Sequence, residues 1–171
     1  MEHRYRNDPS KSLVGFLVGA VQYALPIANV REIAKPLPMV ELPHAPLAVV
    51  GVAEYRGEVI PVVDLRARFG QPQAPPTRKT KWIVALVSNR TVALVVDAVT
   101  EVFGTAGEDL RPVPTLGAGD GARGIAGVTT RDGLVFVLDA LRLAELIEPL
   151  TTAAPGRAEA SLSLVQREGS T

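Results

Sequence analysis

Short apolar segments dominate the middle of the chain, and residues that favour turns separate them. Gly, Pro, Asn and Asp recur between these segments about every eight to twelve residues, a spacing typical of short antiparallel strands. The segments are rich in Val, which packs well on a pleated surface. The pattern therefore predicts four β-hairpins, with strands at residues 14–18, 23–27, 48–55, 58–64, 82–87, 92–96, 125–130 and 134–138.

The segments between these hairpins predict less regular structure. Residues 28–33 fit a short helical turn or a bent strand, and residues 65–69 a short helix. Prolines keep residues 36–43 extended, because proline cannot donate to a central strand ladder. Gly and Pro make residues 103–124 a long loop. A closing helix is predicted at residues 139–148, where apolar residues recur at helical spacing: Leu141, Leu143, Leu146 and Ile147.

A local pattern occurs twice, with the copies about seventy residues apart. Ala24-Leu25-Pro26-Ile27, Val30 and Glu32-Ile33 are echoed by Ala93-Leu94-Val95-Val96, Val99 and Glu101-Val102; Gly51-Val52, Gly57, Val59 and Leu65-Arg66 are echoed by Gly127-Val128, Gly133, Val135 and Leu141-Arg142. Two copies are too few for a solenoid and indicate two related units packed on each other. The repeated positions are mostly apolar or Gly, which favours a scaffold over a catalyst.

Many short strands and a twofold repeat predict two small β-barrels side by side. Each barrel buries little by itself, so we expect a third apolar region between them and joint unfolding. Residues 13–150 form the domain, with approximate sub-domains at 13–75 and 76–150 between which an exchange of strands is left open. Residues 1–12 are expected to be a flexible arm and residues 151–171 a loose tail.

Composition excludes several classes of protein. Of the 171 residues, 47% are hydrophobic and 21% charged, and the formal net charge of zero gives no overall attraction to nucleic acid or anionic lipid. The absence of Cys excludes disulfides and thiolate metal sites. No apolar run resembles a signal peptide or approaches the roughly 18–20 residues that span a bilayer. We expect a cytoplasmic protein without nucleic-acid partners and without direct membrane insertion.

Candidate catalytic groups are few. Asp64, Asp97 and Asp139 each end an apolar run, where Asp commonly caps the helix or turn that follows. Paired carboxylates can also do acid–base work if their environments separate their pKa values, so a hydrolase that uses Asp64 and Asp97 stays as an alternative. His3 and His44 have no nucleophile or metal-ligand spacing around them. We expect no catalytic residue, no cofactor and no metal.

Two further kinds of binding site, for a dinucleotide and for single-stranded nucleic acid, have little support in the sequence. Residues 119–124 match G-x-G-x-x-G, but the strand and helix that a dinucleotide site requires are not predicted around them, so we interpret them as a flexible loop. Small β-barrels often bind single-stranded nucleic acid, which makes this a further alternative. Aromatic residues make up only 5% of the chain, which leaves few platforms for stacking bases.

The strongest single signal lies in residues 55–66, which read YRGEVIPVVDLR. Gly57 suits a hairpin turn because it adopts positive φ without steric cost. Pro61 predicts that its strand is an edge strand or carries a bulge. Arg56 at the turn would point its guanidinium outward from a rigid support, and Arg is well suited to protein interfaces. An ordinary solvated Arg is the alternative.

In collinear order, the chain resembles the CheW family of chemotaxis adaptor proteins from about residue 16 to residue 146. The matching stretches are Tyr23-Ala24-Leu25-Pro26-Ile27, Val30-x-Glu32-Ile33, Gly51-Val52, Arg56-Gly57-x-x-Ile60-Pro61-Val62-Val63-Asp64-Leu65-Arg66, Val95-Val96-Asp97-x-Val99, Leu110-Arg111-Pro112-x-Pro114, Ile125-x-Gly127-Val128 and Val137-Leu138-Asp139. The resemblance implies an all-β fold of two five-stranded, SH3-like barrels with a few short helices, and no enzymatic activity.

The resemblance also implies the partners. Family members bridge the cytoplasmic tip of chemoreceptors to the regulatory domain of the histidine kinase CheA, in receptor arrays. The receptor is held near the first barrel and the interface between barrels. By motif, the receptor-facing residues are Val30, Glu32, Gly51, Glu54, Arg56 and Gly57. The kinase contact is made barrel to barrel, and no motif assigns it to particular residues.

One departure concerns Glu54. The family usually has Asn two positions before the Arg, and this chain has Glu54, which places an anion near Arg56. The departure motivates an alternative within the same fold: a divergent module that binds a receptor or another partner without direct coupling to a kinase, or that serves motility or gene regulation.

Overall fold

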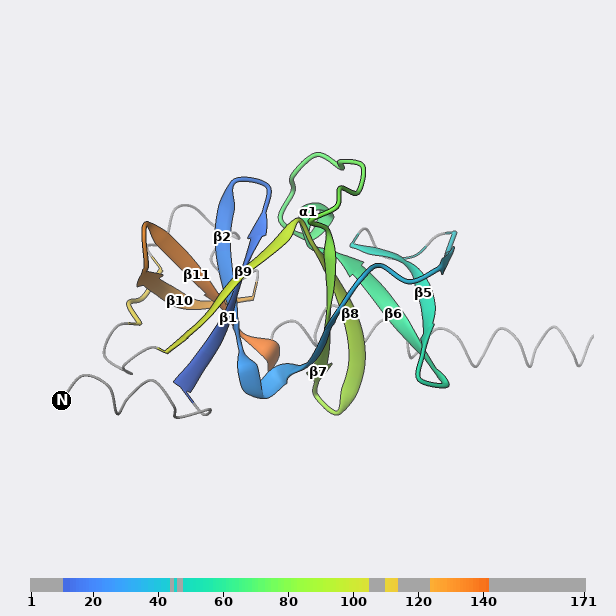
Figure 1. Ribbon diagram of the computed structural model, residues 1–171, viewed down its shortest axis with the longest axis horizontal. Helices are drawn as coiled ribbons and strands as arrows, with labels where there is room; N and C mark the ends of the chain where they lie inside the picture. The colour runs from blue at the N-terminus through green and yellow to red at the C-terminus, as the bar shows by residue number, and fades with distance from the viewer. Residues whose placement is uncertain (1–10, 44, 46–47, 105–109, 114–123, 142–171) are drawn as a thin grey trace, which may run out of the picture.

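The computed structural model describes residues 11–43, 45, 48–104, 110–113 and 124–141. These residues are mostly β and form two sheets that lie side by side (Figure 1), which confirms the predicted fold class. The elements are β1 (Ser12–Val18), β2 (Val21–Pro26), the 3₁₀ helix η3 (Ile27–Asn29), β3 (Val30–Ala34), β4 (Met39–Glu41), β5 (Val49–Tyr55), β6 (Glu58–Asp64), α1 (Leu65–Arg68), β7 (Lys81–Val87), β8 (Arg90–Val96), β9 (Ala98–Gly104), β10 (Ile125–Thr130) and β11 (Leu134–Leu138).

The four predicted hairpins are present, as the antiparallel pairs β1–β2, β5–β6, β7–β8 and β10–β11. Local turn chemistry explains two of them. Arg56 and Gly57 have φ of 50° and 79°, and Ser88 and Asn89 have φ of 47° and 62°. Two successive residues with positive φ make the type I′ turn that matches the twist of paired strands.

Three elements differ from the prediction. Strand β9 is not predicted by the pattern, and the short strand β4 lies in the stretch expected only to be extended. The dipeptide Asp132-Gly133 suits a two-residue type I′ turn, but the turn is longer, because Thr130 pairs with Leu134 and leaves three residues between the strands. The Arg131 N–H donates to the carbonyl of Gly133 at 2.8 Å and closes this wider turn.

Each sheet combines strands from both copies of the repeat. The first sheet has the order β10-β11-β2-β1-β9, and the second has the order β3-β7-β8-β6-β5-β4. If β4 is set aside, the two orders are equivalent, and each sheet contains one parallel pair, β11 with β2 and β6 with β8. The expected boundary between residues 75 and 76 therefore does not separate the sheets, since β6 and β8 are neighbours across it.

Of the two expectations for Pro61, an edge strand or a bulge, the edge strand is wrong for β6 as a whole, while the ladder of β5 with β6 shifts register between Val49 and Gly51, opposite Val62 and Val63. Strand β6 lies between β5 and β8. The parallel ladder with β8 starts only at Val62, directly after the proline, so Pro61 pairs on one side alone, with Val52 of β5. The end of β6 therefore pairs with a strand on each side, whereas its beginning pairs with β5 alone. At the beginning, the missing N–H of proline removes no hydrogen bond from the sheet.

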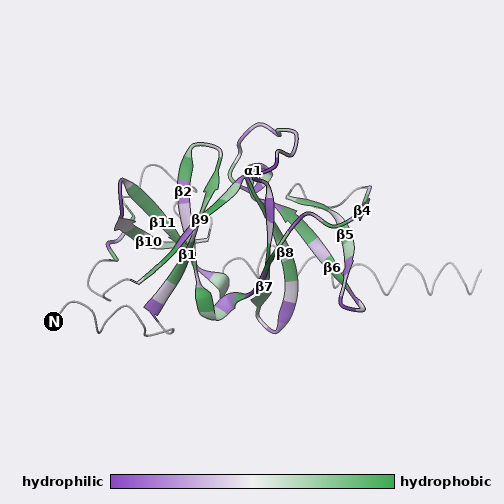
Figure 2. Ribbon diagram, in the orientation of Figure 1, coloured by the Kyte–Doolittle hydropathy of each residue, from purple (hydrophilic) through white to green (hydrophobic). Residues whose placement is uncertain are grey.

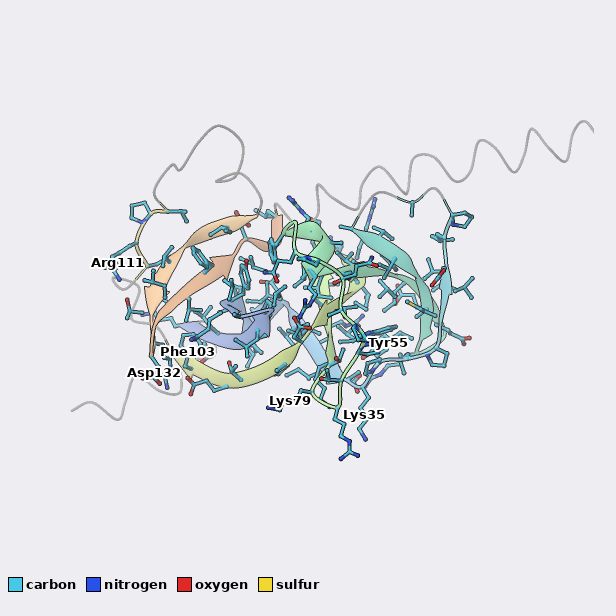
Figure 3. The ribbon with its side chains drawn as sticks, turned by 90° about the horizontal axis from the view of Figure 1, so that it is seen from above. Lys35, Tyr55, Lys79, Phe103, Arg111 and Asp132 are labelled. Carbon is cyan, nitrogen blue, oxygen red and sulfur yellow. The ribbon has the colours of Figure 1, made fainter. Side chains whose placement is uncertain are left out.

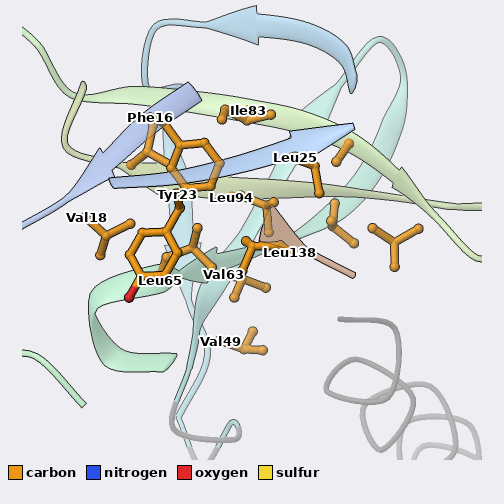
Figure 4. Packing of buried hydrophobic residues seen from close by; sticks show 14 residues of the cluster. Phe16, Val18, Tyr23, Leu25, Val49, Val63, Leu65, Ile83, Leu94 and Leu138 are labelled. Atoms are coloured by element: carbon orange, nitrogen blue, oxygen red, sulfur yellow. The ribbon is translucent and has the colours of Figure 1, made fainter. Parts of the chain in front are cut away.

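The largest apolar cluster lies between the two sheets, and a smaller one lies within each sheet. Phe16 and Leu25 of the first sheet meet Ile83 and Leu94 of the second in this shared core (Figure 4). Figure 2 shows the apolar residues concentrated in the strands. Because the largest cluster needs both sheets, the third apolar region that the sequence predicts is the main core of the molecule.

A polar contact joins the sheets at the β1–β2 turn. Asp97, between β8 and β9, accepts two hydrogen bonds from Arg66 Nε, at 2.9 and 3.0 Å, and one from the Gly19 N–H at 2.6 Å. Asp64 caps α1 by accepting from the Arg66 N–H, and Asp139 accepts from the Leu141 N–H. The capping roles predicted for Asp64 and Asp139 are confirmed, and Asp97 is an inter-sheet contact instead.

Several predicted features lie wholly or partly outside the described residues. Of the closing helix at residues 139–148, only Asp139, Ala140 and Leu141 are described, and the last two are helical. Residues 119–123 of the glycine-rich motif, His3 and His44 lie outside. So do the tail and all of the arm except residues 11 and 12.

Candidate protein-docking site

The turn between β5 and β6 presents Arg56 to solvent. The side chain of Arg56 is 75% exposed, and its Nη2 donates to Glu32 Oε2 on the edge strand β3 at 3.0 Å. Glu32 is itself 38% exposed. The type I′ turn at Arg56-Gly57 holds the start of this side chain rigidly. We call Glu32, Tyr55 and Arg56 the Arg56 corner.

Tyr55 is the third member of the corner, and the sequence does not single it out. Its ring is buried at the end of β5, and its hydroxyl donates to the same Glu32 Oε2 that binds Arg56. The guanidinium carbon of Arg56 lies 5.2 Å from the centre of the Tyr55 ring, within cation–π range. The hydrogen bond to Glu32 raises the pKa of the Tyr55 phenol, because the phenolate could not donate it.

The other predicted site residues lie apart from this corner. Val30 is half-buried at the start of β3 and packs against the shared core. Gly51 is buried in β5, where a Cβ would lie 2.3 Å from the Val40 carbonyl oxygen of β4. Glu54 is exposed opposite Val59. The structure thus brings Glu32, Arg56 and Gly57 together, and the anion that binds Arg56 is Glu32 rather than Glu54.

An apolar groove opens next to η3, lined mostly by residues of the first sheet and its flanking segments, with Ser88 of the β7–β8 turn on the side of the second sheet. Six of the residues that line it are Leu13, Pro26, Asn29, Leu110, Val137 and Leu141. Asn29 Nδ2 donates to the Leu86 carbonyl at 3.3 Å and so ties η3 to the second sheet. Val30 follows Asn29 directly, and Glu32 is two residues farther along β3. The groove and the Arg56 corner are therefore connected by one continuous segment, residues 29–32. We call this groove the inter-sheet groove.

The first sheet has a second corner of similar build, in which Glu101 is the repeat partner of Glu32, while the arginine and the aromatic ring come from other positions of the repeat. Glu101 of β9 corresponds to Glu32, and Arg131 follows β10 as Arg56 follows β5. Arg131 Nε and Nη2 donate to both oxygens of Glu101 at 2.6 and 3.2 Å, and its guanidinium carbon lies 4.9 Å from the Phe103 ring centre. Figure 3 places Phe103 on the first sheet and Tyr55 on the second. We call Glu101, Phe103 and Arg131 the Arg131 corner.

The described residues offer little chemistry beyond binding. Asp64 and Asp97 are the pair considered for acid–base work. Both carboxylates accept a hydrogen bond from a backbone N–H, and Asp97 also accepts from Arg66. Burial raises the pKa of Asp64. Within the described residues no three His, Asp or Glu side chains gather as metal ligands. The same part of the chain contains no helix that is long and apolar enough to span a bilayer.

Two related β-sheets with an exposed charged corner and an apolar groove define a module that binds proteins by its surface. The CheW-like domain family model matches residues 12–148, and the chain belongs to the CheW family of non-enzymatic chemotaxis adaptors. The chain is 38% identical over 136 residues to the chemotaxis protein CheW of Rhizobium meliloti (strain 1021), covering 79% of this chain and 87% of that protein.

Two further comparisons agree with this assignment. Protein FrzA of Myxococcus xanthus is 27% identical over 140 residues, which cover 82% of this chain and 87% of FrzA. The crystal structure of the scaffolding protein TtCheW from Thermoanaerobacter tengcongensis superposes with a TM-score of 0.72 at 28% identity, over 84% of this chain and 92% of TtCheW. The prediction of a non-enzymatic adaptor fold is confirmed, and the alternatives of a hydrolase and a nucleic-acid binder are set aside by this family membership.

Proposed function

We propose that this chain is a cytoplasmic adaptor that binds the cytoplasmic tip of a chemoreceptor at the Arg56 corner and the inter-sheet groove, and links it to the regulatory domain of a CheA-type histidine kinase in a receptor array. The observation that supports the receptor site most is the exposure of Arg56 on a rigid turn. A guanidinium has five N–H donors, and the Glu32 contact uses one of them. The others can bind carboxylate or carbonyl oxygens of a partner.

The two parts of the site suit different parts of the receptor tip. The inter-sheet groove would take apolar side chains, because Leu13, Leu110 and Val137 line it. The Arg56 corner would take polar or acidic groups at the rim of the same contact. The turn fixes the backbone of Arg56 before binding. Formation of the complex therefore costs little backbone conformational entropy at this residue.

The test compares Arg56→Ala with Arg131→Ala, the equivalent change at the other corner. We expect Arg56→Ala to weaken binding to a soluble receptor-tip fragment by about 1–3 kcal/mol, which is roughly 5- to 150-fold. The melting temperature should hardly change, because an exposed ion pair contributes little to stability. Binding is measured by titration calorimetry. Arg131→Ala should leave the affinity unchanged, and equal losses in both variants would remove Arg56 from the receptor site.

In a second candidate function, the protein binds the receptor at the same site but does not bind the kinase. Glu54, where the family usually has Asn, supports this divergent module, because its exposed carboxylate adds negative charge to strand β5 beside the corner. Size-exclusion chromatography with the cognate kinase regulatory domain separates the two candidates. Co-elution supports the adaptor that bridges receptor and kinase. Two separate peaks at micromolar concentrations, with receptor binding retained, would support the divergent module.

A further inference from the structure

Two donors share one oxygen at the Arg56 corner. The Tyr55 hydroxyl and Arg56 Nη2 both bind Glu32 Oε2, and among the described residues Arg56 donates to that oxygen alone. A guanidinium beside a free carboxylate commonly forms two parallel hydrogen bonds, one to each oxygen. A local feature must therefore explain why Arg56 makes only one hydrogen bond to Glu32. That feature is the orientation of the Glu32 carboxylate.

We infer that Tyr55 is a positioning residue for Arg56: its hydroxyl fixes the rotation of the Glu32 carboxylate so that one oxygen faces both donors, which keeps the guanidinium singly bonded and available to a partner. This inference rests on the proposed function, since it assigns Arg56 to the receptor contact. It makes residue 55 a determinant of affinity although its own ring is buried and cannot reach a partner.

The Arg131 corner is a comparison in which, within the described part of the chain, no hydroxyl binds the carboxylate. The aromatic residue under Arg131 is Phe103, which cannot donate a hydrogen bond, and there the guanidinium binds both carboxylate oxygens. The side chain of Arg131 is 44% exposed, against 75% for Arg56. Both corners stack the Arg on an aromatic ring at similar distances, so the ring alone does not explain the difference. The two rings differ in the hydroxyl and also in their place, since Tyr55 directly precedes Arg56 on β5 and Phe103 follows Glu101 by two residues on β9.

The core, rather than Glu32, sets the position of the Tyr55 hydroxyl. The ring is 7% exposed and belongs to the apolar cluster inside the second sheet, with Ile60 and Trp82. A buried tyrosine usually finds a partner for its hydroxyl, and here that partner is Glu32. The raised pKa of the phenol agrees with this assignment. Glu32, on an edge strand and partly exposed, is the member of the corner that can rotate.

Tyr55→Phe removes the hydroxyl and keeps the ring. We expect the Glu32 carboxylate to turn and bind Arg56 through both oxygens, as at the Arg131 corner. The affinity for the receptor-tip fragment should then fall roughly three- to tenfold, the effect expected when a charged donor is diverted. Nuclear magnetic resonance of the arginine side-chain N–H groups should show slower exchange with water for Arg56 and no change for Arg131.

Tyr23→Phe is the matched control, because Tyr23 is also 7% exposed but lies in the shared core, away from the corner. It should change neither the affinity nor the Arg56 signals. A second check uses Glu32→Gln, in which Arg56 loses its charged partner. Adding Tyr55→Phe to Glu32→Gln should cause no further loss of affinity, because the carboxylate through which Tyr55 acts is gone.

The outcomes separate this inference from the proposed function. If Arg56→Ala leaves receptor binding intact, the proposed site is wrong, and the exchange of the Arg56 N–H groups in Tyr55→Phe still tests the positioning. If Arg56→Ala weakens binding but Tyr55→Phe changes neither the affinity nor the exchange, the proposed function stands and the inference is overturned. A Tyr55→Phe variant that binds more tightly than the wild type also overturns it.

Discussion

The Arg56 corner and the Arg131 corner are two versions of one structure, and they differ in how tightly the arginine is held. Both place a Glu on an edge strand opposite an Arg beside a hairpin turn, with an aromatic ring below. Glu101 holds Arg131 through two oxygens, whereas Glu32 holds Arg56 through one and shares that oxygen with Tyr55. Repetition of the fold therefore does not repeat the surface chemistry.

The difference shows how the two halves of a duplicated scaffold can carry different surface contacts. A fully bonded ion pair joins the edge strand to the hairpin and closes the side of the sheet. A partly bonded arginine still joins them but keeps donors for another molecule. The two corners differ in the ring hydroxyl, in the strand that carries the ring and in the position of the arginine, while the strand order of the two sheets stays the same.

The largest expected effect compares the equivalent glycines Gly51 and Gly127. In Gly51→Ala the new Cβ would lie 2.3 Å from the Val40 carbonyl oxygen, so strand β4 must move, and we expect a loss of about 2–3 kcal/mol in unfolding free energy. In Gly127→Ala the new Cβ would lie 2.7 Å from Leu110 Cγ, in a partly exposed side chain, and 2.9 Å from the Arg111 carbonyl oxygen, which belongs to an isolated bridge to Val128 and not to a strand. That loss should be about 1 kcal/mol.

Urea unfolding of both variants measures the two losses. Because the main core is shared by the sheets, each variant should still unfold in one transition. Two transitions in either variant would show that the sheets are independent and that their corners cannot be compared as parts of one folding unit. Equal losses would mean that β4 yields as easily as the Leu110 side chain.

The local parts of the fold could be predicted from the sequence. Hairpins depend on alternating burial and on turn residues a few positions apart, which the chain displays directly. Strand β9 escaped prediction because Thr100, Glu101 and Val102 are exposed in succession, so no alternation marks it. The exchange of strands between the sheets rests on the parallel pairs of β2 with β11 and of β6 with β8, which bring distant segments together and leave no local pattern.

The site could be predicted only in part. Glu32 and Arg56 were found through the family motif, and the structure places them in contact. Tyr55 was missed because its partner is 23 residues away in the sequence. A signal was available, however: alternation along β5 puts Tyr55 on the buried face with Ala53, and a buried tyrosine hydroxyl needs an acceptor. The edge strand with Glu32 was the place to seek it.

A smaller effect compares two arginine–carboxylate pairs. Arg66 and Asp97 are about one-quarter and one-third exposed, and Asp97 also binds the Gly19 N–H across the two sheets. We expect Asp97→Ala to lower the unfolding free energy by about 1–2 kcal/mol, because two charged partners lose their bonds. Glu101→Ala should lower it clearly less, since solvent screens the more exposed pair with Arg131. Thermal unfolding at neutral pH measures both, and the reverse order would contradict the inter-sheet role of Asp97.

The smallest effects are opposite responses of the two corners to pH. The hydrogen bond from Arg131 lowers the pKa of Glu101 below 4.5, so its contribution to stability is present above pH 4.5 and is lost as the pH falls through the folded-state pKa. The raised pKa of Tyr55 has the opposite sign: its contribution is complete below pH 10 and is lost as the pH rises through the folded-state pKa.

Melting temperatures of Glu101→Gln and Tyr55→Phe, each compared with the wild type from acid to alkaline pH, test this pair of responses. The difference for Glu101→Gln should shrink only in acid, and the difference for Tyr55→Phe should shrink only in alkali. Each variant is the control for the other, because the remaining titrating groups are common to both. A Tyr55→Phe difference that stays constant above pH 10 would show that the phenol hydroxyl is not bound to Glu32 in solution, and the contrast between the corners would then lose its cause.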